Sequence, residues 1–170
     1  MERPNADLKD RFLEVYETEH ERTMRVLRAY PVEQLDLRPH EKLKTARELA
    51  WVFVGERRLG VKVWSDAFAH AAPAGKAPLV PDSWEELLDT LEAAHAEFRE
   101  VVRATPEEQL VEKVHFFVAP KTMGEIRRID WAWFLLHDQI HHRGQFSVYL
   151  RMAGGKVPSI YGPTADEPWI

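Results

Sequence analysis

The chain has 170 residues, of which 45% are hydrophobic and 30% charged, values ordinary for one globular domain with a sizeable core. Its net charge of −5 argues against a dedicated nucleic-acid or anionic-membrane surface. The absence of cysteine excludes disulfides, thiolate metal sites and a cysteine nucleophile. The charged start "MERPNADLKD" does not resemble a signal peptide, and no apolar run could span a bilayer, so we expect a cytoplasmic protein with neither a nucleic-acid nor a membrane partner.

Four long amphipathic segments follow one another along the chain and predict four helices. The first extends over roughly 7–30 and stops before Pro31. Each of the other three is preceded by a capping box, in which Ser or Thr is followed three residues later by Glu. The boxes are "TARE" (Thr45, Glu48), "SWEE" (Ser83, Glu86) and "TMGE" (Thr122, Glu125), and the helices that they open cover roughly 45–70, 83–104 and 123–153.

The connecting segments complete the expected fold. "AAPAGKAPLVP" (71–81) is rich in Pro, Ala and Gly and predicts a long crossover between the second and third helices. "VHFFV" (114–118) is short, apolar and strand-like, and "KVPSIYGPTADEPWI" (156–170) is a proline-containing tail that we expect to pack back on the helices. The sequence therefore predicts one all-α domain over 1–170, a four-helix bundle with a long crossover between helices two and three.

The last predicted helix has two apolar faces. One face carries Trp133, His137, Ile140 and His141, and we expect it to point into the core. The spacing of His137 and His141 puts both imidazoles on one side, one turn apart, which suits two ligands of one metal ion. His142 points elsewhere and is a poor ligand candidate for that site. The other face holds Trp131, Leu135, Phe146 and Tyr149, and it predicts a homodimer interface, with cover by the tail as the alternative.

Glu56 is the one acidic residue in the middle of the apolar stripe of the second helix. An unpaired carboxylate is costly in a core, so a cation, a metal ion or a hydrogen-bond donor is expected beside it. The sequence predicts His137, His141 and Glu56 as a metal site, with a plain His137–Glu56 hydrogen bond as the alternative. The other histidines are expected on the surface or in loops (His20, His40, His70 and His115) or at the core edge (His95).

Three stretches of the chain resemble the DinB-like proteins of the DinB/YfiT superfamily: "HDQIHHRGQ" (137–145), "KVPSIYGPTADE" (156–167) and "TARELAWVFVGERRL" (45–59). The resemblance covers nearly the whole chain. It implies an up-down-down-up bundle and a divalent metal, often zinc or nickel, held by one His of helix two and an HxxxH pair of the last long helix. His137 and His141 match that pair. Some relatives are transferases or isomerases that act with low-molecular-weight thiols, and relatives are often dimers.

The chain departs from that pattern in helix two. The family histidine is expected near Trp51 or Val52, but no histidine occurs in this helix before His70. Either Glu56 takes the place of the missing ligand or the site has lost its metal.

Two functional hypotheses follow. In the first, a divalent ion (Zn, Ni, Fe or Mn) bound by His137, His141 and Glu56 supports transfer or hydrolysis on a small electrophile, with Glu56 as ligand or general base and a low-molecular-weight thiol as a candidate substrate. In the second, the metal site is degenerate and the bundle acts as a binding or interaction protein.

Overall fold

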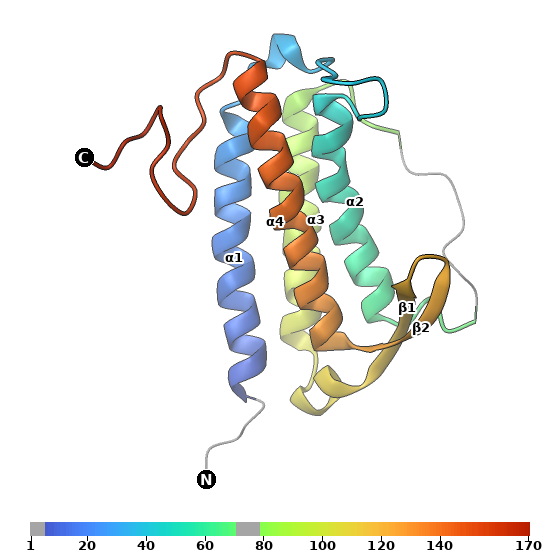
Figure 1. Cartoon of the computed structure of the whole chain (residues 1–170). Helices are drawn as coiled ribbons and strands as arrows, with labels where there is room; N and C mark the ends of the chain where they lie inside the picture. The colour runs from blue at the N-terminus through green and yellow to red at the C-terminus, as the bar shows by residue number, and fades with distance from the viewer. Residues whose placement is uncertain (1–5, 71–78) are drawn as a thin grey trace.

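The structure, a computed structural model, describes residues 6–70 and 79–170 and is mostly helical (Figure 1). The predicted crossover over 71–81 lies outside the described residues except for 79–81. The elements are α1 (Ala6–Arg28), the 3-10 helix η1 (Val32–Gln34), α2 (Ala46–Trp64), α3 (Trp84–Ala104), the 3-10 helix η2 (Glu107–Val111), β1 (Lys113–Ala119), β2 (Thr122–Arg127) and α4 (Arg128–Met152).

Two of the three predicted capping boxes begin helices. The Thr45 side chain accepts a hydrogen bond from the Glu48 backbone N–H, and the Glu48 carboxylate accepts one from the Thr45 backbone N–H. The Ser83 side chain accepts from the Glu86 backbone N–H. The start of α2 and the start of α3 therefore lie where the sequence predicted them.

The third predicted capping box does not begin a helix, so the prediction of an all-α fold was wrong as well. Residues 122–127 form β2, which pairs antiparallel with β1, so α4 begins only at Arg128. The cause is local: Lys121 adopts φ 59° at the turn, and Gly124 lets the strands approach, because a Cβ there would lie 2.6 Å from Cγ2 of Val118. β1 contains the strand-like 114–118, and the fold is a four-helix bundle with a small two-stranded sheet at one end (Figure 1).

The helices pack so that α1 and α2 each contact both α3 and α4. Apolar side chains form two core clusters, one at each end of the bundle. On every helix, buried polar residues lie between the segments that enter the two clusters. This polar layer consists of Glu19, His20, Thr23, Glu56, Arg57, His95, Gln139 and Arg143. The fold thus concentrates its buried charge at mid-height, which is where a site can form without breaking either apolar cluster.

The tail after α4 packs back on the bundle, as the sequence predicted. Val157 and Ile160 pack against one apolar cluster. Arg25 of α1 pairs with Glu167 at 2.5 Å, and the backbone carbonyl of Ser159 accepts from the same arginine at 3.0 Å. The tail is therefore held by apolar burial and by charge.

The face of α4 that points into the core is not the predicted one. Trp131, Leu135 and Phe146 are 1%, 3% and 0% exposed, whereas His137 and His141 are exposed to solvent. The physical reason is that the aromatic and aliphatic face buries more hydrocarbon than a face interrupted by imidazoles and Gly144. The apolar face on which the homodimer prediction rested is therefore accounted for by the core.

Candidate metal centre

Glu56 lies in the polar layer, on the side of α2 that faces α4. It is 8% exposed and sits one turn from Phe53 and Gly60, which are both buried. Removal of the carboxylate from water raises the pKa of Glu56 above its usual value, although His142 partly opposes this shift. The sequence prediction that Glu56 is buried and needs a partner is confirmed.

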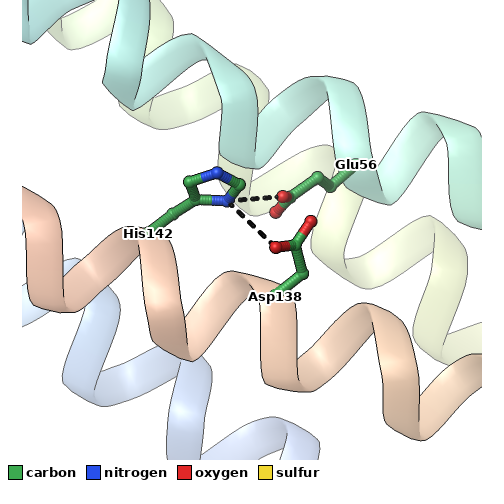
Figure 2. Close-up of side chains that lie close together, drawn as sticks. All are labelled: Glu56, Asp138 and His142. Atoms are coloured by element: carbon green, nitrogen blue, oxygen red, sulfur yellow. Dashed lines mark ion pairs between the residues drawn. The ribbon is translucent and has the colours of Figure 1, made fainter. Parts of the chain in front are cut away.

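The partners of Glu56 come from α4. Asp138 and His142 are four residues apart, so both side chains project from the same side of the helix toward α2 (Figure 2). Nδ1 of His142 lies 2.7 Å from Oε1 of Glu56 and 4.0 Å from Oδ1 of Asp138. The side chains are 9% exposed for Glu56, 20% for His142 and 44% for Asp138, so the cluster opens to solvent on the Asp138 side.

The carboxylates of Glu56 and Asp138 act on the imidazole of His142. Its contact with Glu56 and, less strongly, the charge of Asp138 raise the pKa of His142, while burial opposes the increase. At 2.7 Å the contact is an ion pair, and it is not one of the hydrogen bonds among the described residues.

Buried polar atoms of Glu56 and His142 have no hydrogen-bond partner among the described residues. Oε1 and Oε2 of Glu56 and Nδ1 of His142 are buried and make no hydrogen bond to any residue in 6–70 or 79–170. Buried polar atoms without partners are rare and call for an explanation such as an ion. One ligand atom from each of Glu56, Asp138 and His142 can be chosen so that all lie within 4.8 Å of one another. Ligands about 2.1 Å from a zinc ion lie roughly 3–3.5 Å apart, and the distances of 2.7 and 4.0 Å bracket that range.

Glu56, Asp138 and His142, the triad in the following paragraphs, include only one of the three predicted ligands. His137 and His141 are exposed, and Nε2 of His141 lies 2.8 Å from the side-chain amide of Gln145. They do not join Glu56, and their assignment as ligands stays a prediction. A second i, i+4 pair, Asp138 with His142, overlaps the HxxxH pair in the sequence and was missed because the wrong face was assigned to the core.

A second buried group was also missed. His20 is 6% and His95 3% exposed, and their rings stack with centroids 3.7 Å apart, so the expectation of a surface position for His20 is wrong. Nδ1 of His20 accepts from Arg57 at 3.2 Å, because a guanidinium only donates, so His20 carries its proton on Nε2 and donates it to Glu92 at 2.8 Å. Parallel rings do not aim their lone pairs at one point, which makes this pair unsuited to one metal ion.

The fold and the triad together define a class: a four-helix bundle with a candidate metal-binding group of Glu, Asp and His in its interior. The chain belongs to the DinB family, whose sequence profile matches residues 1–169. It is 30% identical over 159 residues to the uncharacterized protein YrdA of Bacillus subtilis strain 168, a match that covers 93% of this chain and 90% of YrdA.

Solved structures have the same fold. A DinB-like protein from Bacillus cereus ATCC 10987 superposes with a TM-score of 0.71 at 24% identity, over 88% of this chain and 95% of that one. A DinB-like protein from Bacillus subtilis, YjoA, superposes with a TM-score of 0.66 at 14% identity, over 88% of this chain and 97% of that one. The TM-scores support the shared fold, and at these sequence identities nothing follows about activity.

Proposed function

We propose that the protein is a metal-dependent enzyme whose divalent ion is held by Glu56, Asp138 and His142. The observation that carries the proposal is the set of buried ligand atoms on Glu56 and His142 that make no hydrogen bond within the part of the chain that the structure describes. Two carboxylates and one imidazole are a donor set suited to zinc, nickel, iron or manganese, and the chain has no cysteine to supply thiolate. We propose Glu56 as a ligand, as the sequence predicted, and Asp138 and His142 as the other two ligands instead of the exposed His137 and His141.

The residues suggest how the site would work. Three protein ligands leave a coordination position open for a small molecule, and the bound ion would supply Lewis acidity and lower the pKa of a water or thiol placed there. Asp138 is the most exposed member of the triad, so its carboxylate is the ligand that solvent reaches most easily. Glu56, buried against His142, would orient the imidazole and serve as ligand or general base. We propose transfer or hydrolysis on a small electrophile, with a low-molecular-weight thiol as a candidate substrate.

A second candidate function is a non-catalytic bundle that acts as a binding protein. The observation that favours it is the direct 2.7 Å contact between His142 and Glu56, which compensates part of the buried charge without an ion.

Metal content per chain, measured on protein purified without a His-tag, tests the proposal. The wild type is expected to carry one equivalent. Glu56→Gln, Asp138→Asn and His142→Ala are expected to lose it, and His137→Ala and His141→Ala, which change exposed residues, to retain it. Retention in all three triad variants, or its loss in His141→Ala alone, would show that the ion lies elsewhere. Glu56 and His142 are more buried than Asp138, so if their variants fold poorly, Asp138→Asn still tests the proposal.

The reaction class needs a separate test. Glutathione and free cysteine, added to nickel-loaded protein, are expected to change its visible absorbance if a thiol reaches the open position. An unchanged spectrum at millimolar thiol would remove the thiol-dependent part of the proposal.

Further parts of the proposal concern topology, assembly and location. We propose the up-down-down-up order, which the helix directions in Figure 1 support. We propose a homodimer through the outer face of α4, where Phe134, Val148 and Met152 are 53%, 58% and 54% exposed. Among residues 6–70 and 79–170, no helix is both long and apolar enough to cross a membrane. A cytoplasmic location is proposed on the sequence alone.

A further inference from the structure

We infer that a cavity between α2 and the 38–44 segment binds a small molecule with an apolar body and an anionic group. We take this anion to be the class of molecule on which the metal centre acts, and in that respect the inference rests on the proposed function. The segment that contains these residues joins α1 to α2 and folds over the start of α2 (Figure 1). The cavity has a volume of about 490 Å³, within the range of small-molecule pockets.

The cavity has an apolar lining. Leu43 comes from the segment, Trp51 and Val52 from α2, and Val80 from the chain that leads to α3. Gly55, on the same side of α2, adds open space, because a Cβ built on it would meet no atom within 4 Å. Such a surface favours a hydrocarbon or aromatic body, which is desolvated as it enters.

The rim is cationic although the chain has a net charge of −5. Lys42 and Lys44 line the cavity and have no ion-pair partner among the residues that the structure describes. Arg38 and Glu48, also at the rim, pair with each other at 3.3 Å and cancel. Glu41 offsets one of the two lysines, so two positive charges and one negative leave +1. This excess favours an anionic group at the mouth.

The cavity lies beside the triad. Val52 in its wall precedes Glu56 by one turn of α2, so their Cβ atoms are about 5–6 Å apart. On the other helix, the hydroxyl of Tyr149 donates to the backbone carbonyl of Lys44 at 3.0 Å, and Tyr149 follows His142 by two turns of α4. A molecule with its apolar body in the cavity is therefore about one helical turn from Glu56 along α2 and about two turns from His142 along α4.

Octanoate, octan-1-ol and octylammonium provide matched probes, because they share a chain length and differ in charge. Titrations followed by amide chemical shifts and by calorimetry are expected to give octanoate at least fivefold tighter binding than octan-1-ol, with octylammonium weakest. The shifted amides should include those of residues 42–44 and 51–55. Equal or tighter binding of octylammonium would overturn the inference about the anionic group.

Gly55→Leu fills the cavity. Leu is a better helix former than Gly, and the open space at this position admits it, so the variant should fold. Octanoate is expected to bind it at least tenfold more weakly. Gly144→Leu is the matched control, since Gly144 is also an exposed helical glycine with open space around its Cβ position, and it should bind octanoate as the wild type does. Unchanged octanoate affinity in Gly55→Leu would overturn the inference.

The double variant Lys42→Ala/Lys44→Ala is expected to lower octanoate affinity to that of octan-1-ol while octan-1-ol itself binds unchanged. Lys62→Ala, on an exposed position of α2 outside the cavity, should change neither affinity. Metal content is measured on the same samples. Octanoate binding at the cavity without bound metal would refute the proposed function alone, and bound metal without octanoate binding would refute this inference alone.

Discussion

Replacement of Glu19 by Leu should destabilise the protein strongly, because it leaves a buried guanidinium without its counter-charge. Glu19 pairs with Arg143 at 2.6 Å, and the two side chains are 6% and 2% exposed. The hydroxyl of Tyr161, in the tail, donates to the same carboxylate at 2.7 Å. Without that carboxylate, the partners of the Arg143 guanidinium among the described residues are the Glu19 backbone carbonyl, at 3.1 Å, the Thr23 hydroxyl, at 3.4 Å, and the Tyr161 hydroxyl.

Removal of one partner of a buried ion pair costs about 3–5 kcal/mol, a large part of the roughly 5–15 kcal/mol that stabilises a domain. The desolvation of Glu19 raises its pKa, but the hydrogen bonds from Tyr161 and Arg143 outweigh it and leave the pKa below the ordinary value, which favours the charged carboxylate. Glu19→Leu/Arg143→Met removes both charges, so it should be more stable than Glu19→Leu alone.

Urea unfolding followed by circular dichroism measures these differences. Glu14→Leu is the control on the same helix, because Glu14 pairs with Arg11 at 2.9 Å with side chains 68% and 62% exposed, and such a surface pair is worth no more than about 1 kcal/mol. The reasoning fails if Glu19→Leu loses no more stability than Glu14→Leu, or if the double variant is less stable than Glu19→Leu.

Burial, followed by the charge of Arg57, lowers the pKa of His20 to about 4; burial, followed by the charge of His20, also lowers that of His95. Because both are neutral in the fold, their stabilisation is complete above about pH 6.5 and declines below it, by up to about 1.4 kcal/mol per pH unit each. As the pH is lowered below 6.5, the urea midpoint should fall in the wild type and in His40→Gln, and it should fall less in His20→Gln. Equal changes of the urea midpoint with pH in the three proteins would contradict this. Thr45→Ala should cost about 1 kcal/mol by removing the cap of α2, and a thermal midpoint equal to wild type would refute that. Light scattering at micromolar concentration should find a dimer that Phe134→Asp dissociates, and a monomeric wild type would exclude the proposed interface.

Local signals predicted much of the fold. The capping groups of Thr45 and Ser83 placed the starts of α2 and α3, because a cap depends on residues three positions apart. The same pattern at Thr122 failed, because the turn at Lys121 and the pairing with the neighbouring β1 outweigh the helix signal of the capping box. The strand-like character of 114–118 was visible in the sequence, but its partner was not.

Of the triad, only Glu56 was among the residues predicted from the sequence. Glu56 could be found because a lone carboxylate in an apolar stripe has one physical meaning, a need for a partner. The partner could not be chosen, since α4 has two faces with histidines and a rotation of about 100° exchanges His141 for His142. The deciding quantity was the apolar area that each face buries against the other helices, which depends on the packed bundle.

Crystals grown with zinc, with data collected at the zinc absorption edge, test the central claim most directly. The account predicts one strong anomalous peak per chain within about 2.0–2.2 Å of a carboxylate oxygen of Glu56, a carboxylate oxygen of Asp138 and a ring nitrogen of His142. A peak on His137 and His141 instead, or no peak within reach of Glu56, would contradict it.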